Sequence, residues 1–210
     1  MGKRSNLERE DRDYYKTPLA AVKPLIPFLP KGPFTYAETC AGDGRLVRHI
    51  TELTGGDGVC RFACDIEPQE PWITQRNALM VMEPDMDGVD MFITNPPWSR
   101  DKKSGYLLHT LIEHCCAMRP TWFLFDADHM HTVQAAPYLD RLVAVVAIGR
   151  VKWFEDSKMT GKDNCQWSLY HKDARKICAA PMFFGRGIAP PANFANAYLP
   201  RVPFGIKEAA

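Results

Sequence analysis

Apolar and polar residues alternate along the chain in blocks that are typical of a protein built from strands and helices. Short apolar runs predict strands buried on both faces, as in parallel sheets. Longer segments, in which apolar residues recur every three or four positions, predict helices with one buried face. We expect a first strand that begins at residue 35 and further strands over residues 59–64, 89–94, 122–125 and 143–148. The expected helices cover residues 18–29, 45–53, 104–119 and 137–141.

A glycine-containing turn joins the strand that begins at residue 35 to the following helix. Glu38 ends this strand, and Gly42 and Gly44 come next. Glycine lets a backbone adopt positive φ and approach a ligand closely. The turn has neither the full Gly-x-Gly-x-x-Gly pattern of dinucleotide sites nor the Gly-Lys-Ser/Thr pattern of P-loops. It predicts a site for another small ligand, and the Glu38 carboxylate suits a cationic amino group on that ligand.

Two acidic residues follow the next expected strand. An acid about 20 residues after a glycine turn commonly binds the hydroxyl groups of a ribose. Asp65 has this spacing, and Ile66 beside it is suited to cover one face of an adenine. Glu67 is the alternative ribose ligand, and both acids are also compatible with a solvated loop.

The most specific motif is Asn95-Pro96-Pro97-Trp98, directly after the apolar run 89–94. Proline has no backbone N–H, so the strand must end there. Ligands of open α/β sheets bind at the carboxyl ends of strands, where this motif is expected to lie. Two hydrogen-bond acceptors and a flat ring suit a planar exocyclic amine, since the acceptors bind its N–H groups while the ring stacks on its base. The alternative is a surface Asn-Pro turn before a helix.

In their order and spacing, the glycine turn, the ribose acid and the Asn-Pro-Pro-Trp motif resemble those of class I S-adenosylmethionine (SAM) dependent methyltransferases. The resemblance is specifically to the N6-adenine DNA methyltransferases of the small phage and prophage type, and it covers about residues 12–170. It implies an α/β, Rossmann-like fold with a mostly parallel seven-stranded sheet and helices on both faces. The aromatic runs 151–154 and 166–170 resemble the antiparallel edge hairpin of such a sheet, and the polar connection between them is expected to lie over the substrate.

The resemblance implies transfer of the SAM methyl group to the exocyclic N6 of an adenine that is flipped out of DNA. The side-chain oxygen of Asn95 and the carbonyl of Pro96 are then expected to accept hydrogen bonds from the amine. The second proline, Pro97, keeps the loop rigid, and Trp98 stacks on the base. The reaction requires no metal.

The segment before the first helix also resembles these enzymes, in which a Tyr-x-Thr-Pro sequence packs on the methionine part of SAM. Considered alone, it is a helix start with Thr17 as N-cap and Pro18 at the first helical position. The resemblance further implies an adenine contact from Asn77, where related enzymes often have Asp. The expected cofactor-binding residues are Tyr15, Thr17, Pro18, Glu38, Cys40, Ala41, Gly42, Gly44, Asp65, Ile66, Asn77 and Ala78.

The formal net charge of +1 does not by itself indicate nucleic-acid binding. A balanced total can nevertheless hide a local basic surface. Two basic groups are candidates for contacts with DNA phosphates, one near the N-terminus and one after Trp98, and the alternative for the second is a solvated loop. The expected DNA-binding residues are Arg100, Lys102 and Lys103, and the N-terminal group consists of Lys3, Arg4, Arg9 and Arg12.

Composition is that of a soluble globular protein, with 46% hydrophobic and 24% charged residues. Seven cysteines without a Cys-x-x-Cys pair argue against a disulfide framework or a zinc site, so we expect reduced thiols. The run 129–131, with Asp126 and Asp128, is a metal-like cluster; we expect no metal there, but ordinary loop residues or a role near the target base. No apolar run reaches the length of a membrane span and the N-terminus lacks a signal-peptide core, which predicts a cytoplasmic protein.

The length predicts a single methyltransferase domain over residues 1–210. Residues 1–30 form its SAM-packing N-terminal segment, and the Pro-rich tail 172–210 is expected to pack as extended segments and short turns. Little of the sequence is left for a separate target-recognition domain. We therefore expect relaxed or short sequence specificity, or a partner that supplies it, which is either a second copy of the chain or a specificity chain.

Several functional alternatives stay open at the level of sequence. Asn-Pro-Pro-aromatic motifs also occur in enzymes that methylate RNA adenine or a protein glutamine, and cytosine N4 is a further acceptor. A non-catalytic SAM-binding partner subunit is a different class of protein, although such subunits usually lack an intact motif of this kind.

Overall fold

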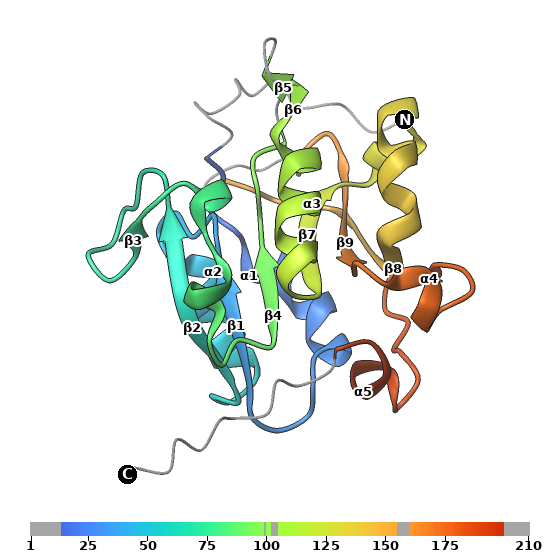
Figure 1. Ribbon diagram of the computed structural model, residues 1–210, viewed down its shortest axis with the longest axis horizontal. Helices are drawn as coiled ribbons and strands as arrows, with labels where there is room; N and C mark the ends of the chain where they lie inside the picture. Colours follow the sequence, from blue (N-terminus) through green and yellow to red (C-terminus); the bar gives the residue numbers. More distant parts are fainter. Residues whose placement is uncertain (1–13, 99, 102–104, 155–159, 200–210) are drawn as a thin grey trace.

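The computed structural model describes residues 14–98, 100–101, 105–154 and 160–199, and its centre is one eight-stranded sheet (Figure 1). The strand order is β10-β8-β9-β7-β4-β1-β2-β3. The strands are β1 (Phe34–Glu38), β2 (Gly58–Asp65), β3 (Thr74–Gln75), β4 (Met91–Thr94), β7 (Thr121–Asp126), β8 (Leu142–Arg150), β9 (Asn164–Tyr170) and β10 (Met182–Phe184). A separate ribbon contains β5 (Arg100–Asp101) and β6 (Gly105–Tyr106).

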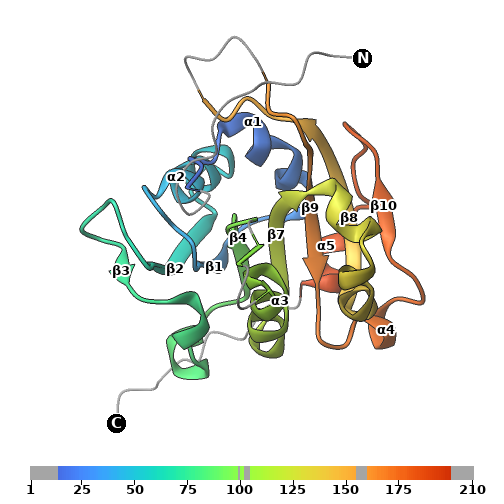
Figure 2. The same ribbon diagram turned by 90° about the horizontal axis from the view of Figure 1, so that it is seen from above.

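Helices cover both faces of the sheet, as predicted. Seen from above, α1 and α2 lie on one face and α3 lies on the other (Figure 2). The α-helices are α1 (Leu19–Val22), α2 (Arg45–Leu53), α3 (Leu107–Met118), α4 (Ala174–Ile177) and α5 (Phe194–Tyr198). The 3-10 helices are η2 (Lys23–Phe28), η3 (Ala78–Met80), η4 (Glu83–Met86), η5 (Ala127–His131) and η6 (Val133–Arg141).

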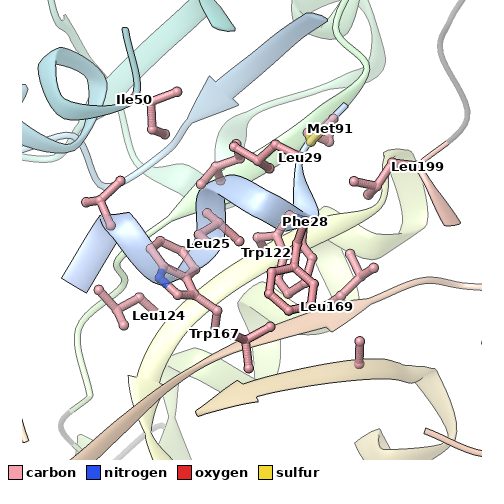
Figure 3. Close-up of a cluster of buried hydrophobic side chains, with 14 of the residues drawn as sticks. Leu25, Phe28, Leu29, Ile50, Met91, Trp122, Leu124, Trp167, Leu169 and Leu199 are labelled. Atoms are coloured by element: carbon pink, nitrogen blue, oxygen red, sulfur yellow. The ribbon is translucent and has the colours of Figure 1, made fainter. Parts of the chain in front are cut away.

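Successive residues of each central strand enter two different hydrophobic clusters, because side chains alternate between the faces of a sheet. On β4, Met91 and Ile93 pack in the cluster under α1 and η2, whereas Phe92 packs against α3. Figure 3 shows the first cluster, in which Phe28 packs against Trp122. All of these strand residues are fully buried, which explains why the strands appear in the sequence as almost uninterrupted apolar runs.

The sheet is mostly parallel, and one of its strands is antiparallel. β1 pairs in parallel with β2 and β4, and β4 pairs in parallel with β7. β9 lies between β7 and β8 and is antiparallel to both. This arrangement confirms the predicted combination of a parallel sheet with an antiparallel pair towards one side.

The prediction of the antiparallel hairpin was wrong for one of its two strands. The partner of β9 is β8, whereas residues 151–154 follow β8 and form no strand. Their aromatic rings pack on the segment before α1 instead: the ring centroids of Trp153 and Phe154 lie 5.8 and 5.9 Å from that of Tyr15. Aromatic content alone does not distinguish a strand from a loop whose rings are buried by a distant segment.

The C-terminal region is more regular than the sequence indicated. β10 adds an eighth strand, parallel to β8, and α4 and α5 flank it in the chain. Phe184 and Phe194 pack at 4.9 and 5.4 Å from Phe28, measured between ring centroids. The tail was expected to be extended segments and turns, but these aromatic side chains bury it against the core. Residues 200–210 lie outside the described part of the chain.

No helix in the part of the chain that the structure describes is both long enough and apolar enough to cross a lipid bilayer.

Candidate active site

A cavity of about 500 Å3 opens near the carboxyl ends of β1, β2 and β4. Parallel pairing brings these ends to the same edge of the sheet, which is where ligands of open α/β sheets bind. The cavity is lined by Tyr14, Tyr15, Lys16, Thr17, Thr39, Cys40, Ala41, Gly42, Asp43, Leu46, Asp65, Ile66, Glu67, Gln69, Asn77, Ala78, Asn95, Pro97, Leu107 and Leu111.

Most residues that the sequence assigned to a cofactor site meet at this cavity. Of the expected cofactor-binding residues, Pro18, Glu38 and Gly44 are not part of its lining. Pro96 and Trp98 are also outside the lining, although Asn95 and Pro97 belong to it. The residues that the sequence reasoning missed are Tyr14, Lys16, Thr39, Asp43, Leu46, Gln69, Leu107 and Leu111. Tyr14 is adjacent to a predicted segment, and the three leucines were recognised as helix positions but not as part of the site.

The glycine loop is held in place by Asp65. Gly42 N–H donates to Asp65 Oδ2 at 2.8 Å, and Ala41 N–H donates to the Cys64 carbonyl at 3.0 Å. Gly42 has φ +52°, and a Cβ there would lie 2.8 Å from the ring of Tyr14. A residue without a side chain is therefore required at this position for two reasons, the backbone conformation and the adjacent tyrosine.

Gly44 supports the loop from outside the cavity. It is the N-cap of α2 with φ +72°, and a Cβ at this position would clash with the indole of Trp72. Trp72 is half exposed and lies in the loop between β2 and β3. Gly44 thus permits close packing of two loops, and this packing accounts for its place in the motif.

Glu38 lies beneath the loop and is completely buried. Its Oε1 accepts hydrogen bonds from Cys40 N–H at 2.9 Å and from the Thr94 hydroxyl at 2.5 Å. Burial raises the pKa of Glu38 to about 8, although these hydrogen bonds oppose the shift. Its Oε2 has no hydrogen-bond partner within the described residues. The carboxyl group therefore ties the glycine loop to the strand that precedes Asn95.

Both candidate ribose ligands line the cavity, and they differ in how they are held. Asp65 accepts from Gly42 N–H through Oδ2 and from Glu67 N–H through Oδ1, each at 2.8 Å. A carboxylate oxygen has more than one lone pair, so both oxygens can accept a further bond from a ligand. Glu67 is exposed at the rim.

The amide of Asn77 is oriented by a local backbone bond. Its Oδ1 accepts from Leu79 N–H at 2.9 Å and caps η3. Because a backbone N–H can only donate, the oxygen must face Leu79, and the Nδ2 group is the end that can serve a ligand as a donor. Ala78, next to it, is buried on the cavity wall.

Thr17 contacts the proposed catalytic loop and does not cap a helix. The N-cap of α1 is Pro18 and no side chain caps this helix, so the alternative of Thr17 as N-cap was wrong. Asn95 Nδ2 donates to Thr17 Oγ1 at 3.1 Å and lies 3.4 Å from the Tyr15 carbonyl oxygen. A contact between two residues that are 78 positions apart in sequence thus joins the segment before α1 to the loop after β4.

Trp98 is anchored beside the cavity. Its indole N–H donates to the Leu124 carbonyl at 3.1 Å, and the ring packs against both hydrophobic clusters. The ring of Trp153 meets it edge-on, with 5.4 Å between centroids and an interplanar angle of 84°. The second aromatic ring was not expected near the catalytic loop, because residues 151–154 had been assigned to a strand.

The expected DNA-binding residues are only partly described. Arg100 lies in β5, directly beyond the catalytic loop, whereas Lys102 and Lys103 lie outside the described residues. The N-terminal group, which consists of Lys3, Arg4, Arg9 and Arg12, also lies outside them.

The metal-like cluster separates into an interior and an exposed part. His129 is buried with its Nε2 2.9 Å from Nε2 of His109, and burial and His109 together lower the pKa of His129 to about 4. His131 is exposed. Within the described ranges, no three His, Cys, Asp or Glu side chains are grouped so that they could hold a metal ion. All seven cysteines are free thiols.

No protein-family model and no curated protein sequence matches this chain. Several solved structures are similar in fold. A chain of a type I restriction-modification complex has a TM-score of 0.56 at 14% identity, over 85% of this chain and 46% of that one. The type I restriction-modification methyltransferase subunit of Streptococcus thermophilus has a TM-score of 0.52 at 13% identity, over 76% and 44% of the two chains.

A third similar structure is described as a class I SAM-dependent methyltransferase from Listeria monocytogenes. It has a TM-score of 0.55 at 12% identity, over 86% of this chain and 68% of that one. This chain spans less than half the length of the two restriction-modification proteins. Together with the strand order and the antiparallel β9, these likenesses show that the chain has the Rossmann-like fold of class I SAM-dependent methyltransferases.

Proposed function

We propose that the protein is a SAM-dependent DNA methyltransferase that methylates the exocyclic N6 of a flipped adenine. One observation carries the proposal: the glycine loop and the Asn95-Pro96-Pro97 loop border the same cavity. They do so because β1 and β4 are neighbouring parallel strands whose carboxyl ends emerge side by side. A methyl donor and an amine acceptor held in one cavity is the arrangement that amine methylation requires.

The residues around the cavity fit SAM. The Tyr14 hydroxyl is buried without a hydrogen-bond partner in the described part of the chain, although it borders the cavity. A buried hydroxyl in this state is costly unless a ligand satisfies it. Asp65 and Glu67 offer carboxylates to ribose hydroxyls, and Asn77 offers an N–H group to an adenine nitrogen. When bound, SAM supplies an electrophilic methyl group.

The chain's own residues orient the amine that receives the methyl group. The Asn95 side-chain oxygen and the Pro96 carbonyl accept hydrogen bonds from the amine, which turns its lone pair towards the methyl donor. Pro97 restricts the loop to a narrow range of conformations. Well-oriented reactants can lower a barrier by about 7–11 kcal/mol, so this positioning is a major part of catalysis. Trp98 is proposed to stack on the target base from beside the cavity.

DNA is the proposed substrate for two reasons. The Asn-Pro-Pro-Trp and Tyr-x-Thr-Pro segments resemble those of adenine-specific DNA enzymes, and two similar structures come from DNA restriction-modification systems. Arg100, Lys102 and Lys103 are proposed to contact phosphates beside the flipped base. For target recognition, we propose relaxed or short sequence specificity, or a partner chain that supplies it.

Nucleoside mass spectrometry tests the proposal. The purified protein is incubated with SAM and unmethylated DNA, with Asn95→Ala as the matched control. We expect N6-methyladenine with the wild type and not with the variant. Parallel incubations with RNA, with cytosine-rich DNA and with protein extract distinguish the other acceptors. SAM binding without methylation of any acceptor would instead support a non-catalytic partner subunit.

A further inference from the structure

The side-chain amide of Asn95 has a defined orientation in the structure. Its Nδ2 lies 3.4 Å from the Tyr15 carbonyl oxygen and 3.1 Å from Thr17 Oγ1. A backbone carbonyl can only accept hydrogen bonds, so the NH2 end of the amide must face Tyr15. The oxygen is therefore directed to the other side. Asn95 lines the cavity together with Tyr15 and Thr17, so the oxygen is the end of the amide that is left for an amine bound there.

This orientation matters because the two ends of an asparagine amide are nearly equal in size but opposite in hydrogen bonding. An amine that is to be methylated brings N–H donors. It gains nothing from an NH2 group turned towards it, whereas an oxygen accepts its bond and directs its lone pair. Packing alone cannot select between the two orientations, so a hydrogen-bonding partner has to do so.

Thr17 is suited to this selection from the opposite side. It is only 5% exposed and lines the cavity. A hydroxyl has one proton and two lone pairs. When Thr17 Oγ1 accepts from Asn95, its own proton stays available, and within the described ranges no residue accepts it. The remaining direction for this proton is the cavity, where a bound cofactor can supply an acceptor.

We infer that Thr17 is a positioning residue that holds the Asn95 amide with its oxygen towards the acceptor amine, and that cofactor binding at the Thr17 hydroxyl reinforces this orientation. The inference rests on the proposed function and deepens it. It links the two halves of the site. When the cofactor accepts a hydrogen bond from the Thr17 hydroxyl, a lone pair of the same oxygen remains to accept from the Asn95 NH2 group. Catalytic contact with the amine still belongs to Asn95.

A kinetic experiment tests the positioning role. Thr17→Val keeps the shape of the side chain and removes the acceptor, whereas Thr17→Ser keeps the hydroxyl. With saturating SAM, we expect Thr17→Val to lower kcat for adenine methylation at least about tenfold, the size of one lost hydrogen bond, and Thr17→Ser to restore most of it. Wild-type kcat in Thr17→Val would overturn the inference.

A binding experiment decides the same question without catalysis. An aspartate at position 95 has no N–H, so the Thr17 hydroxyl would turn its proton towards it and away from the cofactor. We expect Asn95→Asp to weaken SAM binding several-fold relative to Asn95→Ala, and this difference to disappear when Thr17→Val is added. Calorimetry measures the four affinities, and melting temperatures check that each variant is folded. If Asn95→Asp and Asn95→Ala differ in SAM affinity by the same factor with and without Thr17→Val, the proposed coupling between the cofactor and Asn95 through Thr17 is overturned.

The outcomes separate the inference from the proposed function. A wild type that binds SAM but methylates no acceptor would contradict the proposed function and leave the binding experiment to decide the role of Thr17. If the wild type methylates adenine and Thr17→Val has the same kcat, the inference alone is contradicted. A wild type that binds no SAM would contradict both.

Discussion

The Thr94 hydroxyl donates a hydrogen bond of 2.5 Å to the buried carboxyl group of Glu38. Glu38 ends the strand before the glycine loop, and Thr94 ends the strand before Asn95. The same Oε1 atom also accepts from Cys40 N–H in the glycine loop. One carboxyl group thus fixes the relative position of the two loops, while the contact between Thr17 and Asn95 joins the second loop to the segment before α1.

We expect the stability of the protein to depend on the protonation of Glu38. Its folded-state pKa is about 8, above the ordinary value of 4.5, so folding takes up a proton between these pH values. The stability that Glu38 contributes is therefore complete below about pH 4 and is lost as the pH rises towards 8, on the order of 1 kcal/mol per pH unit. Glu38→Gln mimics the protonated group and should remove this dependence.

Urea unfolding of wild type and Glu38→Gln at several pH values between 5 and 8 measures this effect. The difference between the two proteins is the relevant quantity, because other groups titrate identically in both. Parallel pH profiles would show that Glu38 is already ionised in the folded protein at neutral pH.

Gly44→Ala should be more harmful than Gly32→Ala, although both glycines have nearly the same positive φ, +72° and +74°. The shared backbone strain costs about 1–2 kcal/mol. A Cβ at Gly32 meets no atom within 4 Å, whereas one at Gly44 meets the indole of Trp72. We expect a further loss of about 1–3 kcal/mol from overpacking at Gly44.

Thermal unfolding of both variants, together with SAM calorimetry, checks this comparison. Only Gly44→Ala should weaken SAM binding, since Gly44 is part of the glycine loop. Adding Trp72→Ala should recover the steric share of the loss but not the backbone strain. No recovery in this double variant would argue that the close packing of the two loops is unimportant.

Asp65→Asn should weaken SAM binding even though it is nearly isosteric. Two backbone N–H groups, from Gly42 and Glu67, donate to the two carboxylate oxygens, and an amide offers only one oxygen. The amide therefore disturbs the glycine loop and offers the ribose a weaker, uncharged acceptor. One hydrogen bond between a ribose hydroxyl and a charged group is worth about 1.5–3 kcal/mol, so we expect an affinity loss of at least about tenfold. Glu67→Gln is the control at the exposed rim and should have a smaller effect. The reverse ranking by calorimetry would assign the ribose contact to Glu67.

Trp98→Phe separates anchoring from stacking. It keeps an aromatic ring but removes the N–H that binds the Leu124 carbonyl. We expect a stability loss of about 1–3 kcal/mol from the unsatisfied carbonyl with methylation largely kept, while Trp98→Ala should also impair substrate binding. An unchanged free energy of unfolding for Trp98→Phe in urea would contradict an anchoring role for Trp98.

Much of the fold follows from local patterns in the sequence. The strands that lead to Glu38 and Asn95 are buried on both faces, and the strand that leads to Asp65 is partly exposed but still rich in β-forming residues. Their positions and their parallel arrangement could therefore be predicted. Strand β10 and residues 151–154 could not. Short aromatic segments carry no periodicity that distinguishes strand from loop, and their state depends on which distant surface buries them.

The sequence by itself determined the motifs, their order and their placement at the ends of strands, because glycine, proline and apolar spacing act on the nearest few residues. Only the tertiary structure decided what each side chain contacts. Glu38 is a buried tie between two strands, Thr17 is a partner of Asn95, and Trp98 is anchored to Leu124. These roles depend on contacts between residues that lie tens of positions apart. Which partner a polar side chain finds is set when the sheet and its loops come together, since a buried donor or acceptor must then be satisfied by whatever lies beside it.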